Sequence, residues 1–425
     1  MDQFQTTSDA AIYRESDLPF LTGDLPGIGG VIKQLSADFV VSEVPLYPPS
    51  GEGTHVYIRI EKQGITTDQA VHRLARALGR QRRDVGYAGL KDAHAITRQT
   101  LSIEHVDPNA VAELGIDGLR VLAISRHNNK LRLGHLAVNR FAIRIRDIDI
   151  DDTTVKRTAA ILAVLEQRGV PNYFGPQRFG SRGTNAAVGL AALRGDFEAA
   201  VKLILNELDA GEDTAIAEAQ SLAMRGEYAE SNQRWPHWCK TQQRICHSLA
   251  RGGDAKRAWM TVDHSMRRLY ISAAQSFIFN RVLARRIANV DQVMTGDVAM
   301  LHRNGACFAI EDEAIEQPRA DQFEISATGP IIGRRMTQPN GQPAEIERDA
   351  LTDLRLTEAI KENGEINYRD KFKIDGSRRP LRVPLTNVEY TSGTDQVGAY
   401  LELRFTLPPG SYATTVVREV CKRQS

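Results

Sequence analysis

The stretch GYAGLKDAHAITRQ, at residues 86–99, contains the pattern that decides the fold of the first part of the chain. Two glycines bracket a short strand-like segment, and a turn that carries Lys91 and Asp92 follows them. The residues at 100–103, TLSI, then indicate a returning strand. A carboxylate displayed on a loop by a rigid sheet, with an ammonium beside it, is held ionised and positioned to act as a nucleophile or base. A Lys-Asp pair at a turn is also common on ordinary surfaces, so the residue types alone leave both interpretations open.

Strand patterns lie on both sides of this turn and return at the far end of the chain. Apolar residues alternate with polar or small ones at residues 56–60, 141–146 and 400–407, which is the period of a half-buried strand. In the second of these, Phe141 shares one face with the isoleucines at 143 and 145. The pattern predicts a sheet built from both ends of the chain.

Helical patterns separate the strands and dominate the middle of the chain. Residues 68–78 carry an apolar stripe, with Thr67 or Asp68 as the expected N-cap and Gly79 as the stop. Further helices are predicted at residues 155–168, 196–208 and 265–287.

The order of these elements predicts an α+β protein with a mixed sheet. A strand-rich N-terminal part, a helix-rich middle and a strand-rich C-terminus indicate a catalytic domain interrupted by an inserted domain. Strand character returns near Leu381, which favours insertion over simple concatenation.

Composition places the chain among globular proteins. It has 425 residues, 42% hydrophobic and 25% charged, and its 54 Lys and Arg against 53 Asp and Glu leave a formal net charge of +1. The length predicts two or three domains, and the near-neutral balance excludes a polybasic nucleic-acid arm as the main feature.

The positive charge is nevertheless unevenly distributed. Residues 118–146 contain no acidic side chain but seven basic ones: Arg120, Arg126, Lys130, Arg132, Arg140, Arg144 and Arg146. Acidic residues gather instead between Glu207 and Glu230. The segregation is typical of a surface that binds a phosphate backbone, although a solvated strand face would give the same pattern.

Several common sites and locations can be set aside. The glycines at 27–30 lack the third glycine of a dinucleotide fingerprint, and no metal-binding spacing occurs around His237, Cys239 and Cys246. Four irregularly spaced cysteines indicate a reducing compartment, and the first residues show no secretory pattern. No apolar run approaches the roughly 20 residues that span a bilayer. We therefore expect a cytoplasmic protein without membrane contact or disulfides.

The turn at 86–99 resembles the signature Gly-x-Ala-Gly-x-Lys-Asp-x-x-Ala-x-Thr-x-Gln of the TruD family of tRNA pseudouridine synthases. Other blocks similar to the family occur in order along the chain: GGVIK at 29–33, DFVVSE at 38–43, GEGTH at 51–55, His127, NRF at 139–141, GVPNYFGPQRFG at 169–180 and LPPGSYAT at 407–414. The resemblance runs from about residue 25 to the C-terminus.

The resemblance implies a fold and a reaction. The fold would be a mixed-sheet α+β pseudouridine synthase domain, residues 1–168 and 384–425, with a helix-rich TRUD domain inserted at 169–383. The reaction would convert a uridine of tRNA, position 13 in the D-arm region, into pseudouridine. Asp92 would attack the nucleotide at the sugar C1′ or at the uracil ring. No redox change or hydrolysis occurs in this isomerisation, so neither a cofactor nor a metal is implied.

The resemblance also implies companions for Asp92, and each has a structural alternative. Aromatic rings would stack on a flipped uracil, and Asn139 would meet its edge, because a base must leave the RNA stack before its glycosidic bond is reached. The lysines would orient the carboxylate or contact phosphate, and Arg178 would face RNA where the inserted domain begins. Alternatively, Phe141 caps the core and Lys91 faces solvent. Beside Asp92, the expected substrate-binding residues are Lys33, Phe39, Lys91, Asn139, Phe141, Arg178 and Tyr412.

A rival interpretation is an RNA-binding or RNA-folding protein of the same fold without catalysis. The aspartate at position 92 favours the enzyme, because phosphate binding does not require a carboxylate. The expected partner is tRNA, no obligatory protein partner is evident, and we expect a monomer.

Overall fold

The computed structural model describes residues 13–93, 95–211, 213–360 and 374–422. Within these residues the chain forms two compact units. The first, called here the sheet unit, comprises residues 22–170 and 383–422. The second, the helical unit, comprises residues 13–21 and 171–382.

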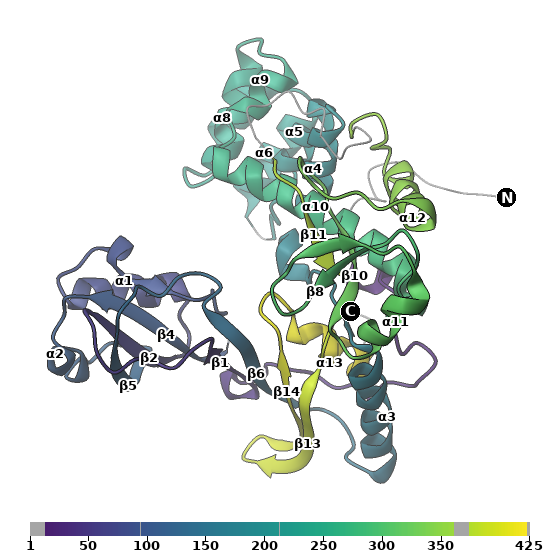
Figure 1. The fold of residues 1–425 in the computed structure, drawn as a ribbon. Coiled ribbons are helices and arrows are strands. Elements are labelled where there is room, and N and C mark those ends of the chain that lie inside the picture. The colour runs from purple at the N-terminus through teal and green to yellow at the C-terminus, as the bar shows by residue number, and fades with distance from the viewer. Residues whose placement is uncertain (1–12, 94, 212, 361–373, 423–425) are drawn as a thin grey trace. The chain divides into compact units, whose positions relative to one another are not determined.

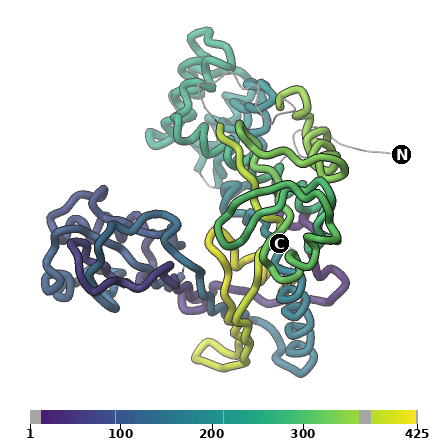
Figure 2. Tube along the Cα trace, in the orientation of Figure 1, coloured from purple at the N-terminus to yellow at the C-terminus, as the bar shows by residue number. Residues whose placement is uncertain are grey.

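The sheet unit is built around a mixed sheet with the strand order β13-β14-β6-β1-β4-β2-β5, and β3 is paired to β4. Strands β1 and β4 run parallel and the other neighbours run antiparallel. The strands are β1 (Phe39–Pro45), β2 (His55–Lys62), β3 (Gly86–Tyr87), β4 (Ile96–Glu104), β5 (Leu119–His127), β6 (Leu136–Ile145), β13 (Thr386–Asp395) and β14 (Gly398–Leu407). The C-terminal hairpin β13–β14, yellow in Figures 1 and 2, therefore completes a sheet begun by the N-terminal strands.

The α-helices among the described residues of this unit are α1 (Thr67–Ala77), α2 (Pro108–Ala112), α3 (Asp152–Arg168) and α13 (Ala413–Cys421). The apolar stripe of α1, including Val71 and Leu74, packs on the buried residues of β2 and β4, among them Ile58 and Leu101. Burial of this stripe fixes the helix beside the turn that follows β3.

The predicted cap of α1 was wrong by one residue. Thr66, in extended backbone conformation, caps the helix by accepting a 3.1 Å hydrogen bond from the backbone N–H of Gln69. Thr67 cannot cap because its backbone is already helical, and its side chain points inward instead. The stop at Gly79 is confirmed, with φ at 63°.

The strand register places several side chains on one face of the sheet. Phe141 lies opposite Val41 on β1 and opposite Phe405 on β14, while Asn139 lies opposite Glu43. Since side chains alternate between faces, Phe39 and Glu43 share the face of Phe141 and Asn139.

A buried ion-pair cluster joins the hairpin to this sheet. The guanidinium of Arg146, 2% exposed, donates to both carboxylate oxygens of Asp38 and to Asp395 at the end of β13. Because burial of an unpaired guanidinium is costly, both carboxylates are needed to keep Arg146 in place.

The helical unit contains a bundle and a second, four-stranded sheet with the order β11-β10-β8-β9. Its helices are α4 (Asn185–Leu193), α5 (Phe197–Leu205), α6 (Thr214–Met224), α7 (Tyr228–Arg234), α8 (Lys240–Ala250), α9 (Ala255–Met260), α10 (His264–Arg286), α11 (Glu313–Asp321) and α12 (Gly341–Asp353). Its strands are β8 (Val298–Leu301), β9 (Cys307–Ala309), β10 (Ile325–Ile331) and β11 (Ser377–Pro380). Two short strands, β7 (Val170–Pro171) and β12 (Arg382–Val383), pair where the chain passes between the units.

Helices α4 and α10 approach each other closely at Gly189. A Cβ at this position would lie 2.0 Å from the carbonyl oxygen of Tyr270, so only glycine fits. The long helix α10 thus packs directly on α4 and forms the centre of the bundle.

Candidate active site

A buried lysine stabilises the turn that carries Asp92. Lys62, 1% exposed at the end of β2, donates hydrogen bonds to the carbonyl oxygens of Ile65 (2.8 Å), Lys91 (3.2 Å) and Asp92 (2.8 Å). Burial lowers the pKa of Lys62 to about 8. Its ammonium therefore replaces water as the partner of three backbone carbonyls and fixes the turn.

A second contact fixes the same turn from the side of α1. The hydroxyl of Thr67 accepts a 2.8 Å hydrogen bond from the backbone N–H of Lys91 and donates a 3.0 Å bond to Gln99 on β4. The N–H and C=O groups of Lys91 are thus both bound by side chains, and Asp92 is displayed from a rigid support.

Lys33 faces the carboxylate of Asp92. Its Nζ lies 3.0 Å from Oδ2 of Asp92, and both side chains are a little under one-third exposed, so the ion pair is open to a ligand. Lys33 has a φ of 62°, uncommon for a residue other than glycine, and its ammonium also lies 4.5 Å from the centre of the Phe39 ring.

Lys91, adjacent in sequence to Asp92, has a different partner. Its Nζ lies 2.6 Å from Oε1 of Glu43, and both side chains are buried. The other carboxylate oxygen of Glu43 accepts from the backbone N–H of Thr100 at 3.2 Å. The alternative that Lys91 faces solvent is therefore wrong, because its ammonium lies inside a buried ion pair, where it also has no access to phosphate.

Aromatic rings form one wall beside the Lys33–Asp92 pair. Phe39 and Phe141 meet edge to face at 6.3 Å between centroids, and Phe141 stacks on Phe405 at 5.5 Å. Phe141 is 8% exposed, so it both closes the core and lines this wall. On the same strand, the amide oxygen of Asn139 is buried and has no hydrogen-bond partner among the described residues. A ligand donor would satisfy this oxygen.

The two remaining predicted residues lie further along the chain. Tyr412 directly precedes α13, five residues after the end of β14, and Leu407 at that end is the register partner of Asn139. Arg178 belongs to the helical unit, in a 3-10 turn at Pro176–Phe179. There its Nε donates to Ser276 at 3.2 Å and its guanidinium lies 5.6 Å from the centre of the Phe174 ring.

A cavity of about 290 Å³ also opens within the sheet unit and reaches Glu43. Its walls include Tyr57 on β2 and the ring of His135, whose Nδ1 lies 2.8 Å from the hydroxyl of Tyr47. The rings of Tyr47 and Tyr57 thus line the same cavity as Glu43, the residue that forms an ion pair with Lys91.

The basic segment at 118–146 is less available than its sequence indicates. Arg144 pairs with Glu402 at 2.8 Å and with Asp395 at 3.2 Å, and Arg146 is buried in the cluster described above. Arg120 pairs with Glu61 at 2.7 Å. Partners far away in sequence neutralise these arginines, whereas Arg132 remains exposed without a carboxylate partner among the described residues.

Sequence reasoning missed Lys62, Glu43 and Thr67. The alternation that buries the residues at 56, 58 and 60 extends to position 62, and the alternation of Phe39 and Val41 extends to Glu43. A charged residue that continues a buried face is the signal that predicts a buried, partnered charge.

The described part of the chain contains neither a three-residue group of metal ligands nor a membrane-spanning helix. None of its His, Cys, Asp and Glu side chains forms a group of three placed to bind a metal ion. Over the same residues, no helix combines the length and apolar character needed to cross a membrane.

Comparisons with known proteins match nearly the whole chain. The family model described as tRNA pseudouridine synthase D (TruD) matches residues 16–420. Proteins named tRNA pseudouridine synthase D from Geobacter sulfurreducens and Geotalea daltonii are 47% and 46% identical, over 96% and 95% of this chain and 98% and 99% of their own lengths.

A solved structure shares the fold. It is a crystal structure of a Methanosarcina mazei protein, provisionally described as tRNA pseudouridine synthase D, with a TM-score of 0.81 and 26% sequence identity. The match covers 97% of this chain and 98% of that one. The predicted α+β class with a mixed sheet is thereby confirmed. The fold and the sequence similarity together define a pseudouridine synthase. Within that class, the chain belongs to the TruD family of tRNA pseudouridine synthases.

Proposed function

We propose that this protein converts uridine 13, in the D-arm region of tRNA, into pseudouridine, with Asp92 as the nucleophile. The observation that carries the proposal is the Lys33–Asp92 pair, displayed on a turn whose backbone is fixed by Lys62 and Thr67. A nucleophile must be held in position and open to its substrate, and this carboxylate meets both requirements.

The proposed reaction balances without a cofactor or a metal. Asp92 attacks the nucleotide, at the sugar C1′ or at the uracil ring, and the bond between N1 and C1′ breaks. The uracil turns, its C5 forms the new bond to C1′, and the bond between Asp92 and the nucleotide breaks, which regenerates the carboxylate. C5 then loses its proton and N1 gains one, so the product is an isomer of the substrate.

The surrounding residues have roles that follow from their placement. The ammonium of Lys33 orients Asp92 and offsets its negative charge before attack. The wall formed by Phe39 and Phe141 offers stacking surface to the flipped base, and Tyr412 is proposed to add to it. The unpaired oxygen of Asn139 would accept from an N–H on the uracil edge.

The remaining roles concern support and RNA contact. Lys91 supports the turn through its ion pair with Glu43 and is not proposed to contact the substrate directly. Arg178, half-buried beside Phe174, is proposed to contact the RNA backbone. Residues 1–168 and 384–425 are proposed to carry the chemistry and residues 169–383 to contribute RNA contacts, although residues 13–21 belong to the helical unit. The protein is further proposed to be a cytoplasmic monomer that needs no other protein.

Tritium release from tRNA labelled at uridine C5 tests the proposal, because the label leaves when C5 joins the ribose. We expect release by the wild type and none above background by Asp92→Asn, a loss of at least a thousandfold. Asp117→Asn, an exposed aspartate of the same unit, is the matched control and retains wild-type release. A tRNA with cytidine at position 13 yields no release if the site is position 13.

Two results would overturn parts of the proposal. Activity in Asp92→Asn would remove Asp92 from the mechanism. A wild type that binds tRNA tightly yet releases no tritium would favour the rival function, an RNA-binding or RNA-folding protein without catalysis.

A further inference from the structure

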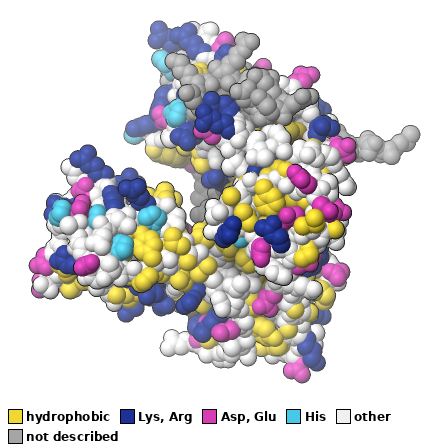
Figure 3. Space-filling view, viewed as in Figure 1, with side chains coloured by type: hydrophobic (Ala, Val, Ile, Leu, Met, Phe, Trp, Pro, Cys, Tyr) yellow, Lys and Arg dark blue, Asp and Glu magenta, His cyan; other side chains and the backbone are white. Residues whose placement is uncertain are grey.

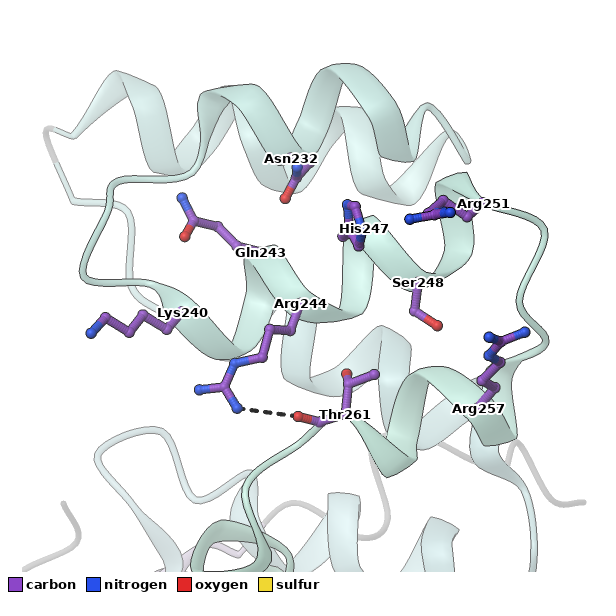
Figure 4. Close-up of a pocket in the computed structure, with 9 residues that line it drawn as sticks. All are labelled: Asn232, Lys240, Gln243, Arg244, His247, Ser248, Arg251, Arg257 and Thr261. Carbon is purple, nitrogen blue, oxygen red and sulfur yellow. Dashed lines mark hydrogen bonds between the residues drawn. The ribbon is translucent and has the colours of Figure 1, made fainter.

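The helical unit contains a groove of about 880 Å³ whose lining is basic and polar. It lies along α8, with residues of α7 and of the segment around α9 on either side (Figure 4). Its lining residues are Asn232, Lys240, Gln243, Arg244, His247, Ser248, Arg251, Arg257 and Thr261. None of these side chains is acidic.

The cations of α8 lie on a single stripe. Lys240, Arg244, His247 and Arg251 follow one another at intervals of four, three and four residues, which is the spacing of one helix face. All four are exposed, whereas Ile245 and Cys246 on the opposite face are buried. The stripe covers about 16 Å of helix, enough to follow several phosphates of a nucleic-acid strand.

Most of this charge is not neutralised by residues that the structure describes. Arg244 is held by Asp263, with hydrogen bonds of 2.8 and 3.0 Å to its two carboxylate oxygens. Lys240, Arg251 and Arg257 form no ion pair with any described residue. Like charges around one groove repel one another, so an anion in the groove would relieve an existing cost.

Helix stabilisation accounts for only part of the arrangement. The negative end of the α8 dipole favours His247 and Arg251 near the C-terminus. The dipole of α9 likewise favours Arg257 in its last turn. The α8 dipole, however, disfavours a cation at Lys240, which is the first residue of that helix. The space-filling view in Figure 3 also shows Lys and Arg side chains, in dark blue, on the part of the surface formed by this helical region.

The neutral residues of the groove complement the cations. Asn232, Gln243, Ser248 and Thr261 carry amide or hydroxyl groups, which are the groups that contact phosphate and sugar in nucleic-acid complexes. Among the lining residues, the imidazole of His247 is the one aromatic ring. The cations, amides and hydroxyls outnumber it, so the chemistry of the groove suits a sugar-phosphate backbone better than the bases.

We propose that this groove binds the sugar-phosphate backbone of the substrate tRNA, independently of sequence, as an anchor additional to the active site. The proposal rests on the proposed function for its choice of RNA. Lys240, Arg251 and Arg257 contact phosphates directly, and Asp263 holds Arg244 in an orientation that lines the groove.

The test is the binding of a tRNA transcript to full-length Asp92→Asn protein with and without Lys240→Glu/Arg251→Glu, at 50 to 300 mM salt. We expect the reversed pair to lower affinity at least tenfold at 100 mM salt. The slope of log K against log salt should fall by about 2, because each lost phosphate contact removes roughly 0.7 to 0.9.

Arg268→Glu/Arg303→Glu in the same background is the matched control. It makes the same change in net charge at two exposed sites outside the groove. Equal affinity and slope for the two double variants would overturn the proposal, whether both bind as tightly as the parent or both bind less tightly. If the reversed pair fails to fold, Lys240→Gln/Arg251→Gln replaces it, with a smaller expected loss of about threefold.

The two proposals fail separately. Binding is measured on a protein with Asp92 replaced, so the result does not depend on catalysis. Absence of tritium release by the wild type would refute the proposed function and leave the groove result unchanged.

Discussion

Lys33 and Lys91 lie close to Asp92 but serve different purposes. Lys33 forms an ion pair with Asp92 that is partly open to solvent, whereas Lys91 forms a buried pair with Glu43. A partly exposed pair contributes little to stability, and removing one partner of a buried pair leaves an uncompensated charge.

The two lysines should therefore give opposite phenotypes when each is replaced by methionine. We expect Lys33→Met to lower kcat about a hundredfold through misplacement of Asp92, with less than about 1 kcal/mol lost from the free energy of unfolding. Lys91→Met should cost about 3–5 kcal/mol, because Glu43 stays buried without its partner. Tritium release and urea unfolding measure the two effects. The same stability loss in both variants would contradict the assignment, and Glu43→Gln/Lys91→Met should recover part of the stability.

For individual residues, the sequence predicted the members of the candidate site but not which side chains form ion pairs with each other. Lys33 contacts both Asp92 and Phe39, although it lies 59 residues from Asp92 in sequence. Phe39, Phe141 and Asn139 share one face of the sheet. Adjacency in the chain made Lys91 the expected partner. Only the placement of β1 beside β4 turns Lys91 toward Glu43 instead.

Among the elements, α5 and α10 enclose a carboxyl group with an unusual titration. Glu207 follows the end of α5 and accepts hydrogen bonds from the hydroxyl of Tyr270 on α10 at 3.0 and 3.2 Å. Burial raises the pKa of Glu207 from 4.5 to about 7. The folded protein therefore keeps this proton over a pH range in which the unfolded chain has lost it.

The direction of the pH effect follows from this difference. The stabilisation by the bound proton is complete below pH 4.5 and is lost as the pH rises through about 7. Relative to the wild type, we expect Glu207→Gln to gain about 1–2 kcal/mol in stability between pH 5 and pH 8. Thermal unfolding at both pH values checks this, with Glu218→Gln on an exposed pair as the control. If both variants changed equally in stability between pH 5 and pH 8, burial of Glu207 would not be the cause of the pH dependence.

Element types were largely predictable because their patterns are local. The strands at 56–60 and 400–407 are confirmed within β2 and β14, and the helix predicted at 265–287 matches α10. The strand at 141–146 is confirmed up to Ile145, the last residue of β6. The cap of α1 was not predictable, since Thr66 and Thr67 have the same chemistry. Only the extended backbone of Thr66 distinguishes them.

The net charge of +1 for the whole molecule does not distinguish basic side chains that are held in ion pairs from those that could bind an anion. Arg144 and Arg146 are neutralised by acids from β13, β14 and the turn before β1, all distant in sequence. The sequence could not reveal this, because the pairing depends on how the hairpin joins the sheet.

Arginines of this one basic segment should therefore respond differently to charge reversal. Arg132→Glu is expected to weaken tRNA affinity about threefold and to flatten the salt slope by about 1, because its side chain is exposed and unpaired among the described residues. Arg144→Glu should instead lower the melting temperature, because it places a third carboxylate beside Glu402 and Asp395. Filter binding and thermal unfolding distinguish the two outcomes. A stable Arg144→Glu protein with weakened RNA binding would reverse the assignment.

The buried ammonium of Lys62 has a consequence for how the active-site turn tolerates change. It binds carbonyl oxygens, which every amino acid carries, and it contacts none of the turn's side chains in these hydrogen bonds. The shape of the turn is thus specified independently of the side chain at position 92. Replacement of Asp92 by other residues should leave the scaffold intact, which makes such variants suitable for trapping RNA complexes or for introducing a reactive group at this position.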